Sequence, residues 1–177
     1  MKKLVLPAWT VLCLAVSTQG IAQAPQPGPE VKKLEAFVGT WRYEGEAKAS
    51  PIGPAAKISG TQTARMVMNG FALEWTAEEK GAFGGVQFGE MDVYDASSKT
   101  YPYLGYQSDG TIWSGNLVVT GNTWKFTGTT TSKGVSYGTR GENSFSADGR
   151  TLTWKAEISV DGKTWVPWAQ TTLTKSK

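Results

Sequence analysis

The sequence contains no histidine, and its only cysteine, Cys13, lies within the first two dozen residues. These absences exclude a Ser-His-Asp triad, a thiolate nucleophile and an ordinary zinc site in the rest of the chain. They also exclude disulfides, so the fold has to rest on the burial of side chains. Of the eight tryptophans, seven follow residue 24, and they supply large apolar surfaces for that purpose.

Long apolar runs are absent too, except for one short run at the start of the chain. Lys2 and Lys3 precede apolar residues 4–16, a run too short to span a bilayer as a helix. Small residues follow, as in secretory signal peptides. We expect a signal peptide over 1–22; a cut after Ala24 fits the A-x-A pattern but would leave proline first. The protein is therefore expected to be exported, either periplasmic or secreted.

A strong charge of one sign is also missing. The chain has 18 basic and 15 acidic residues, and without Lys2 and Lys3 the balance falls from net +3 to 16 against 15, net +1. No segment combines clustered basic residues with stacking aromatics, so a nucleic-acid partner is not expected. No strand-to-helix phosphate loop and no calcium loop is present, so the sequence predicts neither a cofactor nor a metal.

The chain after the signal begins with a proline-rich tether over 23–29. Apolar residues at near-helical spacing over 31–38 then predict a short helix, which Gly39 ends. Period-two alternation follows to the end of the chain, so 30–177 is expected to form one domain. The oligomeric state is left open.

Ten strands are predicted between short turns. Asn69-Gly70 and Asp109-Gly110 are the strongest hairpin signals. Because every connection is short, the strands are expected to be antiparallel neighbours, and closure into an all-β up-and-down barrel removes the two exposed edges. A Greek-key sandwich is the alternative. The predicted strands are 40–49, 57–68, 71–80, 86–95, 100–108, 111–119, 122–131, 135–146, 150–160 and 164–174.

A barrel of about eight strands is filled by its own side chains, so ten strands should leave a pocket. Strand parity places an aromatic face inside with a few polar groups, the usual composition of a small-molecule site. Each aromatic taken singly is more often core than ligand contact. The polar candidates include Gln62, Gln107, Thr139 and Thr171. The predicted ligand-binding residues are Tyr43, Met66, Trp75, Tyr103, Trp113, Phe126, Tyr137, Asn143 and Trp154.

Four stretches carry a family resemblance: "LEAFVGTW" from Leu34, the Asn69-Gly70 hairpin, "VYDASSKTY" from Val93, and "SADGRTLTWKAEISVDGKTW" from Ser146. Together they resemble an exported bacterial family of unknown function that is similar to the calycins, the lipocalin and fatty-acid-binding-protein superfamily. The resemblance implies a lipocalin-like barrel that a short helix closes at one end.

Within that resemblance, Gly39 and Trp41 correspond to the Gly-x-Trp signature of calycins. It implies that the tryptophan packs at the closed end, with Lys175 as the candidate basic side chain covering it. The opening is also similar to haem-binding barrels of the nitrobindin type, in which a histidine holds the iron. Haem ligation by a histidine is therefore not expected in this protein, because the sequence has no histidine.

The remaining chemistry lies in carboxylates. Glu90 and Asp92 share one face of a predicted strand with Tyr94 and would form a buried acid pair if that face pointed inward. The cost of burying charge favours the opposite assignment, with both acids in solvent and Gly89, Met91 and Val93 inside.

Three functions are weighed from these features. The favoured one is an exported protein that binds a small hydrophobic or amphipathic molecule inside the barrel. The second is an enzyme, such as an isomerase, cyclase or hydrolase, working through carboxylate and tyrosine groups. The third is an outer-surface carbohydrate or interaction module, for which Trp168 is the expected exposed ring because its parity is opposite to that of Trp165.

Overall fold

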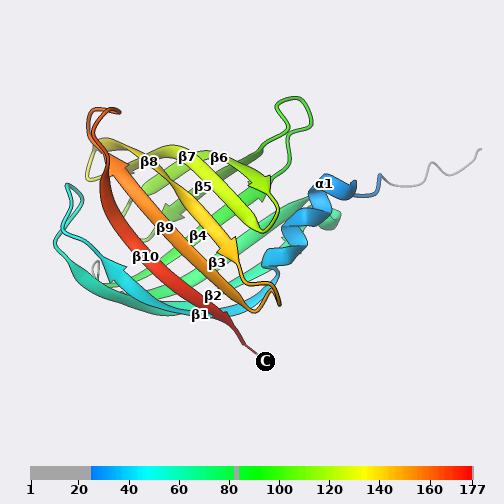
Figure 1. Cartoon of the computed structure of the whole chain (residues 1–177), viewed down its shortest axis with the longest axis horizontal. Coiled ribbons are helices and arrows are strands. Elements are labelled where there is room, and N and C mark those ends of the chain that lie inside the picture. Colours follow the sequence, from blue (N-terminus) through cyan, green and yellow to red (C-terminus); the bar gives the residue numbers. More distant parts are fainter. Residues whose placement is uncertain (1–24, 82–83, 177) are drawn as a thin grey trace, which may run out of the picture.

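The computed structural model describes residues 25–81 and 84–176, which form a closed antiparallel β-barrel with one short helical segment at its N-terminal side (Figure 1). Each strand pairs with the next along the chain, and β1 pairs with β10 to close the barrel. The predicted up-and-down barrel is thereby confirmed, and the Greek-key alternative is excluded. The proposed signal peptide over 1–22 lies outside the described residues.

In the described residues, ten strands and three short helical segments make up the fold, and every predicted strand end lies within two residues of the observed one. The elements are α1 (Pro29–Lys32), η1 (Lys33–Phe37), β1 (Gly39–Ala47), β2 (Ala56–Val67), η2 (Met68–Gly70), β3 (Ala72–Gly81), β4 (Gly84–Val93), β5 (Tyr101–Gln107), β6 (Ile112–Thr120), β7 (Thr123–Ser132), β8 (Val135–Phe145), β9 (Thr151–Ser159) and β10 (Val166–Lys175).

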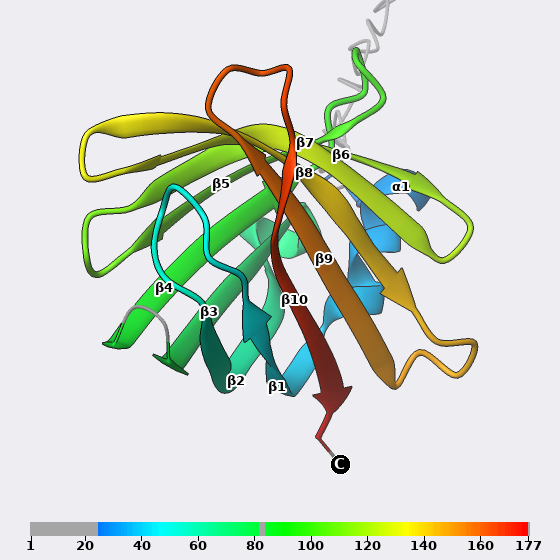
Figure 2. The same cartoon turned by 60° about the vertical axis from the view of Figure 1, so that its left-hand side comes forward.

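One end of the barrel is closed by α1 and η1, which lie across it (Figure 2). Leu34 and Phe37 of η1 are buried in the barrel core. The Phe37 ring lies 5.5 Å from that of Trp75, 5.0 Å from that of Trp124 and 4.9 Å from that of Phe145. These edge-on and tilted contacts are favourable aromatic geometries, so the helix acts as an apolar plug.

The Gly-x-Trp signature joins this plug to the first strand. The indole of fully buried Trp41 donates a hydrogen bond to the carbonyl of Phe37 at 2.8 Å. The ammonium of Lys175 lies 5.1 Å above the Trp41 ring, as the resemblance implied. Gly39 does not cap the helix: it opens β1 at φ 140°, and a Cβ there would lie 2.5 Å from Cε of Lys175. The lack of a side chain at residue 39 therefore leaves room for the Lys175 side chain to lie against β1.

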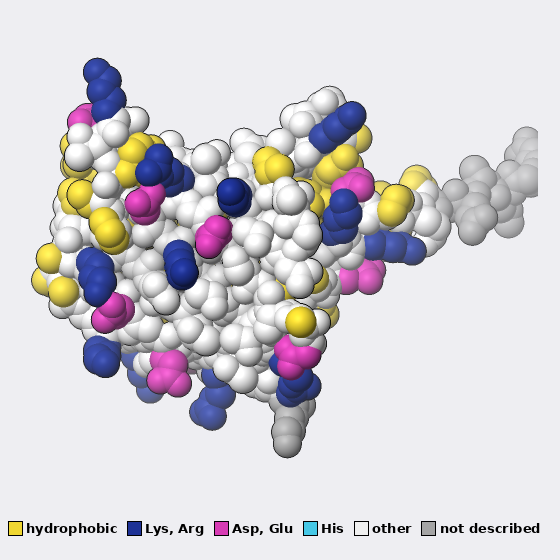
Figure 3. Space-filling model, viewed as in Figure 1, with side chains coloured by type: hydrophobic (Ala, Val, Ile, Leu, Met, Phe, Trp, Pro, Cys, Tyr) yellow, Lys and Arg dark blue, Asp and Glu magenta, His cyan; other side chains and the backbone are white. Residues whose placement is uncertain are grey.

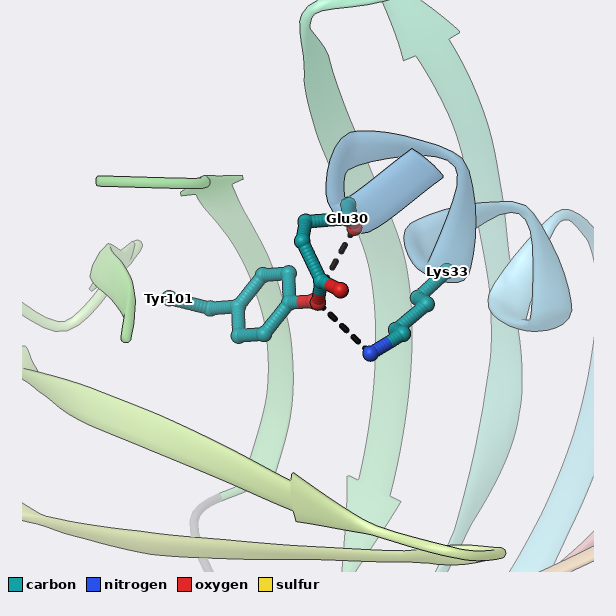
Figure 4. Close-up of polar contacts among 3 residues, drawn as sticks. All are labelled: Glu30, Lys33 and Tyr101. Atoms are coloured by element: carbon teal, nitrogen blue, oxygen red, sulfur yellow. Dashed lines mark hydrogen bonds and ion pairs between the residues drawn. The ribbon is translucent and has the colours of Figure 1, made fainter. Parts of the chain in front are cut away.

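A polar contact holds the helical segment against β5 (Figure 4). The Tyr101 hydroxyl donates to the Glu30 carbonyl at 2.9 Å and to its carboxylate at 3.1 Å, while Lys33 pairs with the same carboxylate at 2.6 Å. Burial, followed by the hydrogen bond to Glu30 and then the Glu30 charge, raises the pKa of Tyr101. The hydroxyl thus remains a donor at neutral pH and ties the plug to the barrel wall.

The Asn69-Gly70 signal marks a tight connection, as predicted, but the turn is wider than two residues. Val67 pairs with Ala72, and three of the four residues between them, Met68, Asn69 and Gly70, have positive φ.

Within the described parts of the chain, no helix is long and apolar enough to cross a membrane.

Candidate functional site

A cavity of about 240 Å³ lies between the plug and the opposite, open end of the barrel. It exceeds the ~150 Å³ that suffices for a benzene-sized guest in a protein core. Its walls combine aromatic rings with amide and hydroxyl groups, the composition expected of a small-molecule site. The polar side chains on the wall include Gln62, Gln107, Thr130, Thr139, Asn143 and Thr171.

Seven of the nine predicted ligand-binding residues line this cavity. They are Tyr43, Trp75, Tyr103, Trp113, Phe126, Asn143 and Trp154. Met66 does not: it packs against the core near the plug. Tyr137 also lies off the wall, buried near the open end, where its hydroxyl approaches the carbonyl of Pro51 at 3.5 Å. Strand parity identifies the inner face, but it does not say how deep along the barrel a side chain lies.

An acid pair on β4 is the main polar feature of the interior. Glu90 lines the cavity, and Asp92, on the same face, is only 3% exposed. The Trp113 indole donates a hydrogen bond to Glu90, and the Trp75 indole donates to Oδ2 of Asp92 at 2.9 Å. Oδ1 of Asp92 is buried without a hydrogen-bond partner among the described residues.

The expectation that both acids face solvent is therefore wrong. Val93 is exposed, and the buried side chain of Val86 shares the inward parity of Glu90 and Asp92. Two indole donors lower the cost of burying these carboxyl groups. They come from β3 and β6 and are far from the pair in sequence, so the sequence alone did not reveal them. Tyr94, the expected phenol beside the pair, instead packs on Tyr101 at 5.0 Å.

The phenol that does lie beside the pair is Tyr103 of β5. Its pKa is raised by burial first, and then by the charges of Glu90 and Asp92. Burial also raises the pKa of Glu90, although the bond from Trp113 opposes the shift. The pKa of Asp92 is raised well above its ordinary value by burial and by the neighbouring Glu90 charge. The site therefore favours a protonated pair when no other positive charge is present.

Gly105 makes the contact between Trp113 and Glu90 possible. It lies between these two residues in the sheet and pairs with both. A Cβ at this position would lie 2.1 Å from Cε2 of Trp113. The absence of a side chain lets the indole lie across β5 and reach the carboxylate on β4.

A second carboxylate lies on the cavity wall. Glu79 accepts a hydrogen bond from the Tyr43 hydroxyl at 3.0 Å. Burial raises the pKa of Glu79, and the hydrogen bond from Tyr43 opposes that shift. Sequence reasoning missed Glu79 because it follows Glu78 in a charged run, and parity alone separates the inward carboxylate from the outward one.

The assignment of the two late tryptophans is reversed by the structure. Trp168 lines the cavity and packs edge-on against Trp154 at 5.8 Å. Trp165 instead receives the Arg140 guanidinium at 4.3 Å from its ring centroid. The register of β10 shifts between Pro167 and Ala169, which breaks the alternation on which the parity argument relied. Trp168 was thus missed as a cavity residue.

The open end has an apolar rim. Strand ends on this side expose Ile112, Val135, Val160 and Val166, and Ile52 of the β1–β2 loop lines the cavity. In Figure 3, hydrophobic side chains lie at the left edge of the molecule, over the open-end loops, with charges of both signs beside them, and others lie on the right near the helical segment. Exposed apolar side chains therefore lie around the open end of the barrel.

The described residues contain no group of three or more Asp, Glu, Cys or His side chains placed to hold a metal. The polar side chains on the cavity wall carry carboxyl, phenol, amide, hydroxyl and indole groups. These can bind polar atoms of a guest and can exchange protons with it.

Comparison with solved structures gives the same fold at very low identity. The crystal structure of Rv2717c from M. tuberculosis is similar over 85% of this chain and 99% of its own, with TM-score 0.60 and 12% identity. The S-type phycobiliprotein lyase CPES from Guillardia theta is similar over 82% of this chain and 92% of its own, with TM-score 0.53 and 11% identity. At such identity these likenesses show the fold alone.

Sequence comparison gives the family. No curated protein matches the chain significantly. Residues 26–166, which include the plug and most of the barrel, match the family described as "Protein of unknown function (DUF1579)". The chain therefore belongs to the DUF1579 family, as the resemblance to an uncharacterised family of calycin-like barrels anticipated.

Proposed function

We propose that the protein is an exported binding protein for a small hydrophobic or amphipathic molecule held in the barrel interior. The observation that carries the proposal is the cavity of about 240 Å³, closed at one end by the plug and walled by aromatic rings. Solid packing of ten strands around their own side chains would have left no such space.

Three further features support binding. The cavity wall offers separate amide and hydroxyl groups that can orient a guest, such as Gln62 and Asn143. The rim at the open end is apolar. One structural neighbour is a phycobiliprotein lyase, so the same barrel fold occurs in a protein named for its action on another molecule. Export is part of the proposal and rests on the signal-like residues 1–22.

Native mass spectrometry of the protein purified from its host would test the proposal by detecting a co-purified small molecule. Thr130→Phe fills the cavity, since Thr130 is buried on its wall. Thr129→Phe is the matched control, because the neighbouring Thr129 points to the outer face. We expect the added mass in the wild type and in Thr129→Phe, but not in Thr130→Phe. An added mass that persists in Thr130→Phe would contradict binding in the cavity.

An enzyme acting in the same cavity is the second candidate. It is favoured by the inward orientation of Glu90 and Asp92, with the Tyr103 phenol close by and the carboxyl pKa values raised. A general acid or base needs a pKa close to the working pH, and burial is one way to achieve it. Conversion of the co-purified molecule by the wild type, abolished by Glu90→Gln, would distinguish an enzyme from a carrier.

A further inference from the structure

The charges of the cavity are all of one sign. Two carboxylates, Glu79 and Glu90, lie on its wall, and Asp92 lies beside Glu90. None of the described residues that line the cavity is a lysine or an arginine. A buried carboxylate normally has a cation or several hydrogen-bond donors nearby, because leaving it alone in an apolar interior is costly.

The hydrogen bonds within the protein compensate the acid pair only in part. Glu90 receives one indole hydrogen bond, from Trp113, and Asp92 receives one at Oδ2, from Trp75. Oδ1 of Asp92, in a side chain that is 3% exposed, receives none from the described residues. The Glu90 carboxyl could serve this oxygen only if the pair held a proton, since two carboxylates cannot bond each other. Without a guest, a proton held by the pair serves this oxygen, and the ammonium group of a guest would take the place of that proton.

The same region is well suited to a cation. Trp75, Trp113 and Tyr103 all line the cavity next to the pair, and aromatic faces attract cations, most strongly when water is excluded. An ammonium group would bring donors to carboxylate oxygens that have few, and charge-assisted hydrogen bonds are the stronger kind. A carboxylate guest would instead add a like charge to an acidic wall.

We propose that the cavity selects apolar amines, bound as ammonium ions with the nitrogen at the Glu90–Asp92 pair and the apolar body against the aromatic wall. The inference rests on the proposed function, since it specifies the class of guest for the same cavity. Binding exchanges one cation for another: the ammonium enters, the pair becomes ionised, and the pair's proton leaves to solvent. The other titratable groups around the cavity are Glu79 on β3, Tyr43 on β1 and Tyr103 on β5.

Calorimetric titration at pH 7.5 with three guests of one shape tests the preference. The guests are 2-naphthylmethylamine, 2-naphthalenemethanol and 2-naphthoate. We expect the amine to bind at least roughly tenfold more tightly than the alcohol, as a charge-assisted bond and a cation–π contact together imply. The carboxylate should bind most weakly.

Two variants assign the preference to the acid pair. Glu90→Gln should weaken amine binding about tenfold and should weaken alcohol binding much less. Glu44→Gln removes the same charge from an exposed outer position and should change neither. In the wild type, titration of the amine in two buffers of different ionisation enthalpy should reveal proton release, which tests the exchange without relying on any variant.

The outcomes separate the two proposals. Equal affinity for amine and alcohol, or tighter binding of the carboxylate, overturns the selection of amines but leaves a binding protein. Amine binding without proton release overturns the exchange. If none of the three guests binds, the selection of amines fails, while the proposed function is judged separately by the co-purified mass.

Discussion

Removal of the Phe37 ring tests whether the helical segment really plugs the barrel. Phe37 is buried and touches the rings of Trp75, Trp124 and Phe145. Phe→Ala changes in cores cost about 3–5 kcal/mol, because apolar contacts are lost and a cavity remains. We expect Phe37→Ala to lower the free energy of unfolding by that amount, and Phe37→Leu to lower it by about 1.5 kcal/mol or less.

Urea unfolding followed by tryptophan fluorescence measures these losses, since two of the contact rings are tryptophans. Tyr106→Ala is the control: Tyr106 is 64% exposed on the outer face, so removing its ring should cost well under the Phe37 value. A shift of the midpoint at constant m-value would indicate lost packing and an unchanged denatured state. A cost below about 1 kcal/mol for Phe37→Ala would refute the plug.

Three further predictions concern the site and export. The raised pKa of Asp92 means that the native state keeps a proton that the unfolded state releases, so stability should fall as pH rises above ~4. Asp92→Asn should reduce this slope, and an equal or steeper slope in the variant would contradict it. Gly105→Ala should displace the Trp113 ring, costing about 1–3 kcal/mol and changing indole fluorescence; an unchanged spectrum would count against the contact. N-terminal sequencing of the exported protein should begin at Gln23, and detection of the intact leader would oppose cleavage.

Local patterns predicted the barrel because its strands obey them. Alternation and short turns fix which neighbours pair, and the β-strand boundaries follow. The one late break shows the limit of this reasoning: the register shift between Pro167 and Ala169 turned Trp168 inward. Pro167 inside the predicted strand was the signal that could have marked this bulge. Alternation also cannot place a side chain along the barrel axis, which is why Met66 was expected in the cavity.

The acid pair shows a different limit. Whether Glu90 and Asp92 face inward depends on donors supplied from other strands, here the indoles of Trp113 and Trp75. The contact with Trp113 in turn depends on Gly105 in the strand between them. Such three-strand arrangements involve residues that are distant in sequence. A rule based on the cost of burying an isolated charge therefore placed these two acids on the outer face, when they face the interior.

The most direct test of cavity binding is an NMR titration that follows the indole N–H signals of the ¹⁵N-labelled protein with 2-naphthylmethylamine. Trp75, Trp113, Trp154 and Trp168 line the cavity, whereas Trp165 lies under Arg140 away from it. We predict saturable shifts of the four cavity indoles and a stationary Trp165 signal. Shifts confined to Trp165, with the cavity indoles unmoved, would contradict binding inside the barrel.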